Sequence, residues 1–510
     1  MSQSTDQFTA PAGEISARDR LVISLLLVSA FVVILNETIM GVALPRLMED
    51  LQITATAGQW LTTAFMLTMA VVIPITGFLI QRFNTRPVFL AAMSLFSLGT
   101  LVSAMAPGFE MLLVGRVIQA SGTAIMMPLL MTTVMTLVPP SSRGKTMGNI
   151  SIVISVAPAI GPTISGIILS VLDWRWMFWL VLPIAVASLV LGGSRIQNVT
   201  TPHRAPIDVL SVILSAFAFG GIIYGLSQFG EAAGGSAVPG WAPLAVGLVG
   251  LAGFVSRQLV LQRRDRALLD LRTFRSRTFT VSILVLSISM MALFGTIILL
   301  PIYLQDVLGL EPAQAGLMLL PGGLAMGLLG PVVGRIFDRH GPRVLVVPGA
   351  VIVAAVFWSL TLVSESTPVP LVLALHVLLS VGLAGMFTPL FTSALGSVQP
   401  KLYSHASAVV GTVQQLAGAA GIALFVSVMA IQSGALAAGG ASEIPALAGG
   451  IRMAFLCGAV IFLFAVVAAL FVRKPAAPAE TGSPAVPAAS PEPAASPAHD
   501  DDAPSFTSAH

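Results

Sequence analysis

The sequence predicts an all-α polytopic membrane protein: two related six-helix bundles and two inserted helices, fourteen transmembrane helices in all, with both termini in the cytoplasm. Three observations lead to this fold class, namely the composition, the long apolar segments and the distribution of Lys and Arg between loops. Of the 510 residues, 56% are apolar and 9% are charged, whereas about 25% of the residues in soluble domains are charged. The composition therefore excludes an ordinary soluble domain.

Fourteen segments are long and apolar enough to cross about 30 Å of hydrocarbon, which takes about 20 helical residues. In chain order the expected spans are 21–45, 59–81, 87–106, 111–138, 146–170, 176–193, 207–229, 241–260, 279–304, 313–334, 344–363, 369–391, 405–432 and 451–472. Charged or Pro- and Gly-rich breaks separate them. Residues 1–20 are polar and no small-residue cleavage site follows the first span, so we interpret that span as a transmembrane helix and not as a signal peptide.

The basic residues predict the orientation, because Lys and Arg of short loops stay on the cytoplasmic side. Of the 25 Lys and Arg residues, 21 fall on one side of the predicted spans, three on the other, and Arg116 lies inside a span. Both termini are therefore expected in the cytoplasm. The net charge of +3 is too small for the dense basic face that nucleic-acid binding requires. One cysteine and six scattered histidines predict neither a disulfide nor a metal site.

A short pattern recurs in the two halves of the chain, 257 residues apart. A glycine at the predicted cytoplasmic end of a span is followed by arginines five and nine positions later. The two sets are Gly77, Arg82 and Arg86, and Gly334, Arg339 and Arg343. Duplicated halves around a midplane cavity are typical of secondary transporters, so we expect the spans before residue 194 and those after residue 278 to be two copies of one unit.

The predicted organisation has five parts. They are a cytoplasmic segment 1–20, an N-terminal six-helix bundle 21–193, linkers with two inserted helices 194–278, a C-terminal six-helix bundle 279–472, and a cytoplasmic tail 473–510. The tail is rich in Pro, Ala and Ser without apolar periodicity, which predicts disorder. The loop from Arg257 to Arg277 holds seven arginines. It could contact lipid or a partner, but the favoured interpretation is an anchor that fixes the topology.

Glu37, Arg116 and His376 are ionisable residues that lie well inside predicted spans, and Glu37 and Arg116 are the charged pair among them. Because such groups cost ~2.5–3.5 kcal/mol on insertion scales, they are functional candidates. At 1.5 Å per residue, Glu37 lies roughly 13 Å and Arg116 roughly 8 Å below the outer ends of their spans, so the two side chains are expected to meet. Burial disfavours the carboxylate and Arg116 favours it, so Glu37 is predicted to carry a proton near neutral pH. The alternatives are a permanent structural ion pair, or proton transfer at His376.

The repeated pattern resembles the loop signature G-x-L-x-D-R-x-G-x-R of the major facilitator superfamily. The second copy matches at five positions, which are Gly334, Asp338, Arg339, Gly341 and Arg343. The first copy departs from the signature where Gln81 and Asn84 replace Asp and Gly. In that resemblance the Asp caps a neighbouring helix and pairs with Arg, forming a latch between the halves. We expect the latch of the first half to be weakened or differently built.

Further stretches resemble the fourteen-helix drug:proton antiporters of this superfamily. Residues 157–166 are similar to the antiporter signature G-x-x-x-G-P-x-x-G-G at Gly161, Pro162 and Gly166, with Ala157 and Ser165 in place of two glycines. Pro158 and Pro162 are expected to bend this helix. Residues 174–178 match W-R-W-x-F, residues 60–65 resemble W-x-x-T-A-Y, and residues 116–122 resemble R-x-x-Q-G-x-G.

Residues 35–45 resemble L-D-x-T-I-V-N-V-A-L-P, and this variant is also similar to the lincomycin-resistance-type branch. The usual Asp is Asn36 here, and the acid follows ~100° around the helix.

The resemblance implies a proton-coupled antiporter of the bacterial inner membrane that exports small amphipathic or cationic molecules, with Glu37 and Arg116 coupling the proton. Seven residues are predicted to line its substrate pocket: Asn36, Met40, Gln119, Met126, Met127, Phe294 and Gln414. We expect no cofactor, a monomer, and contact with drug-like substrate, protons and membrane lipid. An exporter of an endogenous metabolite or lipid is the nearest alternative. A non-transporting receptor or scaffold, or a membrane enzyme, is less favoured.

Overall fold

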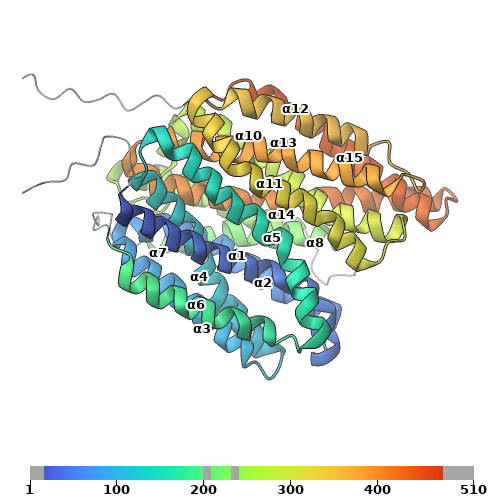
Figure 1. The fold of residues 1–510 in the computed structure, drawn as a ribbon, viewed down its shortest axis with the longest axis horizontal. Coiled ribbons are helices and arrows are strands. Elements are labelled where there is room, and N and C mark those ends of the chain that lie inside the picture. Colours follow the sequence, from blue (N-terminus) through green and yellow to red (C-terminus); the bar gives the residue numbers. More distant parts are fainter. Residues whose placement is uncertain (1–15, 199–207, 231–240, 475–510) are drawn as a thin grey trace, which may run out of the picture. The chain divides into compact units, whose positions relative to one another are not determined.

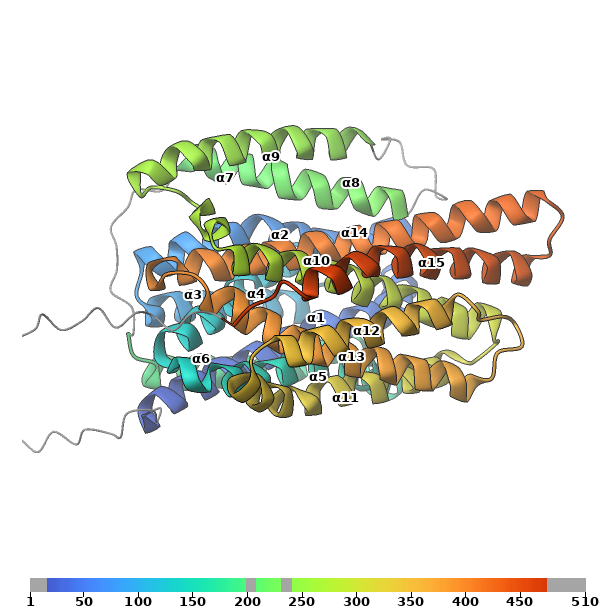
Figure 2. The ribbon, with the colours of Figure 1, turned by 90° about the horizontal axis from the view of Figure 1, so that it is seen from above.

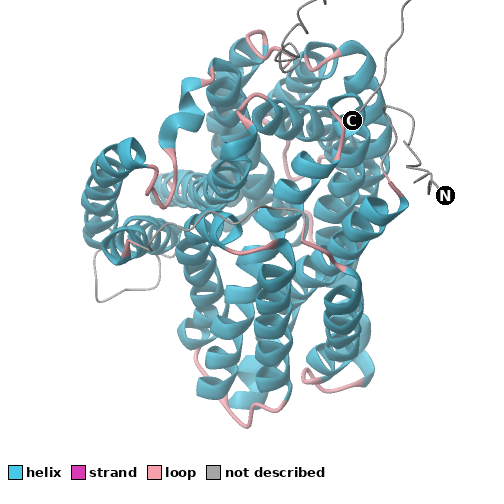
Figure 3. Ribbon diagram, turned by 90° about the vertical axis from the view of Figure 1, so that its left-hand side faces the viewer, coloured by secondary structure: helices cyan, strands magenta, loops and turns pink. Residues whose placement is uncertain are grey.

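The computed structural model describes residues 16–198, 208–230 and 241–474, and every regular element in these ranges is helical (Figure 3). Within these ranges, fourteen helical segments are long and apolar enough to span a membrane, which confirms the predicted number. The segment 1–15, the predicted tail after residue 474 and the loop residues 199–207 and 231–240 lie outside the described residues.

Six helices, which we call the N-terminal bundle, follow one another along the first part of the chain (Figure 1). They are α1 (Ala17–Leu51), α2 (Ala55–Arg82), α3 (Thr85–Ala104), α4 (Phe109–Leu137), α5 (Arg143–Val171) and α6 (Trp176–Arg195). Within this bundle α3 packs against α4 and α6, α1 packs against α5 and α6, and α2 packs against α4.

Two further spans are inserted between the bundles. The first runs through α7 (Val209–Ser215), a π-helical turn (Ala216–Gly220) and α8 (Gly221–Gly230), and the second is α9 (Trp241–Leu261). The helices of this pair pack against each other, and α8 also packs against α2 and α14. Figure 2 shows the pair beside these two helices, at the junction of the bundles.

Six helices after residue 276 form what we call the C-terminal bundle. They are α10 (Arg277–Ile302), α11 (Pro312–His340), α12 (Arg343–Leu360), α13 (Val369–Gly396), α14 (Tyr403–Ala438) and α15 (Glu443–Ala469). A π-helical turn (Tyr303–Val307) extends α10. Within this bundle α10 and α15 pack against α14, and α11 and α12 pack against α13.

Local sequence explains where several helices begin. Thr54 and Ser276 cap α2 and α10, accepting hydrogen bonds from the backbone N–H groups of Ala57 and Phe279 at 3.2 Å each. Such caps satisfy amides that have no partner inside the helix. α1 is longer than the predicted span 21–45, because Ser16 caps it ahead of the apolar run and its helix continues to Leu51. The predicted bounds were too narrow there, since hydropathy marks the apolar run and not the helix.

The two bundles contact each other near one end of the helices. We call this end the arginine-rich end; it holds residues 82–85, 138–143, 261–277, 340–343 and 396–403, and lies at the left in Figure 1. The helix pairs that join the bundles are α5 with α11 and α13, and α14 with α2 and α4. Their contact brings the two copies of the repeated pattern to the interface between the bundles.

Candidate functional site

Arg116 is held in the N-terminal bundle by a chain of polar contacts between α4 and α3. Its Nη1 donates to Oε1 of Gln119 at 2.7 Å, and Nε2 of Gln119 donates to the hydroxyl of Thr100 at 2.8 Å. Arg116, Gln119 and Thr100 are all buried, with relative exposures of 1%, 0% and 0%. Because both ends of the Gln119 amide are engaged, this side chain supports Arg116 from within the bundle. The predicted contact of Gln119 with substrate stays a prediction.

Phe65 of α2 is a second direct neighbour of Arg116. The guanidinium carbon lies 4.1 Å from the centre of the Phe65 ring, within the range of a cation–π interaction. Phe65 is buried and takes the position of the aromatic residue in the stretch 60–65. No role for Phe65 was predicted from the sequence. The aromatic residue at a fixed position of that motif is the feature that could have identified it.

Removing the Gln119 amide is expected to destabilise the N-terminal bundle. A Gln119→Leu variant keeps the volume but leaves Arg116 and Thr100 buried without these partners, which costs about 3 kcal/mol. Unfolding by SDS in mixed micelles measures the loss. The matched control is Ser121→Ala on the same helix, whose hydroxyl donates only to the backbone carbonyl of Val117, at 2.9 Å. Equal stability of the two variants would show that the polar chain contributes nothing.

Glu37 of α1 is half-buried and interacts electrostatically with Arg116. No ion pair between them is present among the described residues. The two side chains thus interact electrostatically without forming an ion pair in this conformation, and Gln119 and Phe65 are direct neighbours of the guanidinium. The permanent ion pair that the sequence left open is likewise not formed here. Glu37 is left able to change its charge without breaking a direct bond to Arg116.

Residues around Glu37 come from α1 and α5. Asn36 is buried, and its Oδ1 has no hydrogen-bond partner in the described part of the chain. Thr38 packs against Gly161 of α5, where a side chain would collide with the Thr38 hydroxyl. Gly161 thus permits the close approach of α1 and α5 next to the acid. Pro158 and Gly166 lie on the same helix, as does Pro162, whose side chain lies outside the described residues.

The other predicted pocket residues lie in both bundles. Met40 and Met126 are buried, and Met127 is half-buried. Phe294 and Gln414 of the C-terminal bundle are half-buried, and Phe294 packs against Gly418 of α14. A role of these residues in substrate binding stays a prediction.

His376 lies on α13 of the C-terminal bundle. Its Nε2 is 3.2 Å from the carbonyl oxygen of Leu319 on α11. The ring packs where Gly322 leaves space, since a Cβ there would collide with it. This placement joins two helices of one bundle, and no described contact connects His376 to Glu37 or Arg116.

The second copy of the repeated pattern joins the bundles at the arginine-rich end. Both carboxylate oxygens of Asp338 accept backbone N–H groups from the first turn of α5, those of Gly144 and Lys145, at 2.8 Å each. Gly334 packs against the backbone of Gly144 in the same contact. A carboxylate at a helix N-terminus also interacts favourably with the helix dipole. The predicted helix-capping contact is therefore present in this conformation.

The arginines of the second copy do not pair with Asp338 among the described ion pairs. Arg339 is exposed, and Arg343 donates from Nε to the carbonyl of Val472 at 3.1 Å. Gly341 has a φ of 80°, a backbone conformation that suits glycine. The expected pairing of Asp338 with an arginine is therefore not formed in this conformation. Backbone N–H groups of α5 bind the Asp338 carboxylate instead.

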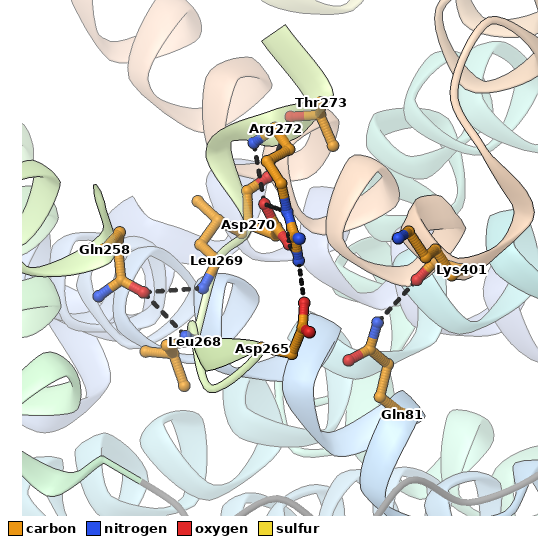
Figure 4. Close-up of polar contacts among 9 residues, drawn as sticks. All are labelled: Gln81, Gln258, Asp265, Leu268, Leu269, Asp270, Arg272, Thr273 and Lys401. Atoms are coloured by element: carbon orange, nitrogen blue, oxygen red, sulfur yellow. Dashed lines mark hydrogen bonds and ion pairs between the residues drawn. The ribbon is translucent and has the colours of Figure 1, made fainter. Parts of the chain in front are cut away.

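The first copy is built differently, as the sequence indicated. Gln81 donates its amide to the carbonyl of Lys401 at 2.9 Å (Figure 4). Gly77 packs against the backbone of Ser404 and His405 in α14. An amide can donate to a carbonyl where a carboxylate cannot, so Gln81 suits this partner better than the usual Asp would.

The arginines of the first copy lie beside these contacts. Arg82 lies 6.0 Å from the centre of the Phe78 ring, and the backbone N–H of Arg86 donates to Oδ1 of Asn198 at 3.3 Å. Two further hydroxyl pairs connect the bundles nearby, Thr132 with Ser407 and Ser151 with Thr388. Sequence analysis could not identify these pairs, because their partners lie more than 200 residues apart.

Neutralising Asp338 is expected to loosen the contact between the bundles at this end. Asn at position 338 loses the charge and one of the two acceptors, which is expected to shift the equilibrium roughly tenfold toward opening. The labelling rate of a cysteine at buried Ala408, in a Cys457→Ser background, measures the opening. The control is Asp306→Asn at an exposed site in the same half of the chain. Unchanged labelling in Asp338→Asn would contradict a latch role.

Comparison with known proteins agrees with this architecture. A family model described as Major Facilitator Superfamily matches residues 26–422. A "Lincomycin resistance protein LmrB" of Listeria monocytogenes is 39% identical over 439 residues, which cover 85% of this chain and 92% of that protein. A protein of the same name from Bacillus subtilis is 40% identical over 411 residues, covering 80% of this chain and 85% of that protein.

Among solved structures, the human organic anion transporter MFSD10 (TETRAN) has a TM-score of 0.63 at 17% identity, covering 88% of this chain and 99% of that one. At that identity the likeness supports the fold alone. The family match covers most of the chain, and the sequence relatives are similar over nearly their whole length. The chain is thus a multi-pass membrane transporter that belongs to the major facilitator superfamily.

Proposed function

We propose that this transporter is a proton-coupled antiporter that exports small amphipathic or cationic compounds from a bacterial cell by alternating access. The observation that carries the proposal is the half-buried Glu37, placed within electrostatic reach of a fully buried Arg116 but not bonded to it. A membrane-embedded acid in this position is costly to retain unless its charge is used.

Glu37 is proposed to exchange a proton for substrate. When Glu37 is ionised, it attracts a cationic substrate and interacts with Arg116; when it is protonated, both attractions vanish and the substrate is released. Arg116 stays in place through this change because Gln119 and Phe65 hold it. At ~100 mV the potential supplies ~2.3 kcal/mol per charge, and one pH unit supplies ~1.4 kcal/mol. One proton can therefore support a gradient of several hundredfold for an uncharged substrate. Exchange of one proton for one monocation moves no net charge, so only the pH difference drives it, about tenfold per pH unit.

Alternating access requires that the contacts at the arginine-rich end break and re-form. They consist of polar bonds that can exchange with water, such as Asp338 to the first turn of α5 and Gln81 to Lys401. We propose that this end faces the cytoplasm, that both termini lie there, and that residues 21–193 and 279–472 move as two units of a monomer. The 21 basic residues on that side support the orientation.

The substrate class is proposed from the relatives and the predicted pocket. The sequence relatives are named for lincomycin resistance, so a lincosamide is the first compound to test. A pocket lined by Met40, Met127 and Phe294, with few polar groups, favours breadth over selectivity. Cationic dyes form the second group of test compounds.

Efflux from cells tests this proposal. The full chain is expressed in a bacterium that lacks its own exporters, and the accumulation of lincomycin and of a cationic dye is followed with and without a protonophore. We expect lower accumulation than in the vector control, and loss of the difference when the protonophore is added. Accumulation equal to the vector control for every compound would favour a dedicated metabolite exporter, and efflux that persists with the protonophore would contradict proton coupling.

A further inference from the structure

A basic cavity lies at the arginine-rich end of the inserted helices, away from Glu37. It has a volume of about 310 Å³ and is lined by Leu259, Gln262, Arg263, Arg272 and Arg275. These residues come from the last turns of α9 and from the segment that connects α9 to α10. The cavity therefore combines three arginines with an apolar side chain from a membrane span.

Buried hydrogen bonds hold the connecting segment in place (Figure 4). Oε1 of Gln258 accepts the backbone N–H groups of Leu268 and Leu269 at 2.8 and 3.2 Å. Arg272 pairs with Asp270 and Asp265, and Asp270 is 2% exposed. The cavity wall is thus an ordered element of the protein, with arginines presented from fixed backbone.

The charges around the cavity are not balanced by protein carboxylates. Of the seven arginines from 257 to 277, Arg257 is bound at 2.6 Å by Asp208, and this hydrogen bonding lowers the pKa of Asp208 to about 2. Arg272 is engaged by Asp265 and Asp270. Arg263 and Arg275 are exposed and take part in no ion pair among the described residues. Two cavity-lining arginines therefore remain for an anion.

The depth of the cavity points to a membrane lipid. It lies where the apolar span Trp241–Arg264 ends, which is the level of lipid phosphates. Leu259 of its lining is 46% exposed, and Val260 and Phe274, which adjoin Leu259 and Arg275 in the chain, are 59% and 40% exposed. A free phosphate gains nothing from such an apolar rim, whereas a phospholipid places its acyl chains there.

We propose that this cavity binds the phosphate headgroup of an anionic phospholipid, with Arg263 and Arg275 as its charged contacts and Leu259 beside its acyl chains. Basic pockets beside transmembrane helices are suited to anionic headgroups. The site is separate from the proposed transport function and does not depend on it.

Lipid binding to the purified full-length protein tests this site. Native mass spectrometry measures retention of phosphatidylglycerol against phosphatidylcholine for the wild type, for Arg263→Gln/Arg275→Gln, and for the matched control Arg264→Gln/Arg266→Gln. The control removes the same charge from exposed arginines of the same segment that do not line the cavity. We expect the cavity variant to lose roughly 10- to 30-fold in phosphatidylglycerol affinity, and the control to lose less than about threefold.

Three results would overturn the proposal. They are equal losses in the two double variants, equal affinity of the wild type for the two lipids, and displacement of phosphatidylglycerol by millimolar glycerol 3-phosphate, which would indicate a site for soluble phosphates. An Arg263→Lys/Arg275→Lys variant controls for misfolding caused by substitution at these two positions. It keeps the charge and is expected to retain most of the phosphatidylglycerol binding.

Discussion

A Glu37→Gln variant is expected to lose gradient-driven export and the attraction for cationic substrates, while still exchanging an uncharged substrate across the membrane. Glutamine keeps the shape of the side chain but cannot release a proton, so the cycle loses the energy of proton entry. The substrate gradient that proton entry supports, about tenfold for each unit of an imposed pH difference, is expected to fall to about unity. Everted vesicles with an imposed pH gradient measure uphill transport, and the exchange of labelled for unlabelled uncharged substrate in the same vesicles measures the remaining activity.

The control for this variant is Glu110→Gln, an exposed acid in the first turn of α4. It removes a carboxylate from the same bundle outside the proposed site and is expected to leave uphill transport unchanged. Uphill transport by Glu37→Gln at the wild-type level would show that Glu37 is structural. His376→Gln would then be the next variant to measure, because His376 is the other titratable candidate within the spans.

A Gly148→Val variant is expected to slow transport roughly 10- to 100-fold by preventing close approach of the bundles. A Cβ on Gly148 of α5 would collide with the backbone carbonyl of Gly330 on α11. Overpacking of such a contact costs about 1–3 kcal/mol, and the cost falls on the conformation in which the arginine-rich end is closed. The initial rate of dye efflux and the labelling of a cysteine at Ala408 measure the effect, and labelling is expected to increase.

Gly316→Val provides the matched control on α11, the helix that Gly148 faces. A Cβ on Gly316 meets nothing within 4 Å, so this variant carries the same change of residue without the collision. Wild-type transport by Gly148→Val would contradict a cycle in which α5 and α11 close against each other. Equal loss of transport in both variants would show that the collision at Gly148 is not its cause.

The helices were predictable because a membrane span needs an apolar run of nearly fixed length. The fourteen runs therefore predicted the number of candidate spans found in the described residues, although the ends of α1 were misplaced because polar residues continue its helix. The position of α7–α9 beside α2 and α14 could not be predicted. It depends on which faces of already apolar helices fit together, and hydropathy does not distinguish those faces.

The ionisable residues of the candidate site were predictable, but their partners were not. Glu37 and Arg116 stood out because charges are rare inside spans. Arg116 is held by two neighbours, Gln119 and Phe65. Residues of these types are common in helices, so only the packing of the helices shows that they contact Arg116. The same holds for Gln81, whose partner Lys401 lies 320 residues away. Its departure from the usual Asp indicated a different latch without showing what the amide would bind.

Simultaneous measurement of proton and substrate fluxes in proteoliposomes tests the central claim most directly. The purified chain is reconstituted, a lincosamide or cationic dye is added on one side, and the pH of the lumen is followed while substrate uptake is recorded. The account predicts proton movement opposite to substrate movement, in fixed proportion and dependent on Glu37. Substrate uptake with no proton movement, or with protons moving in the same direction, would contradict it.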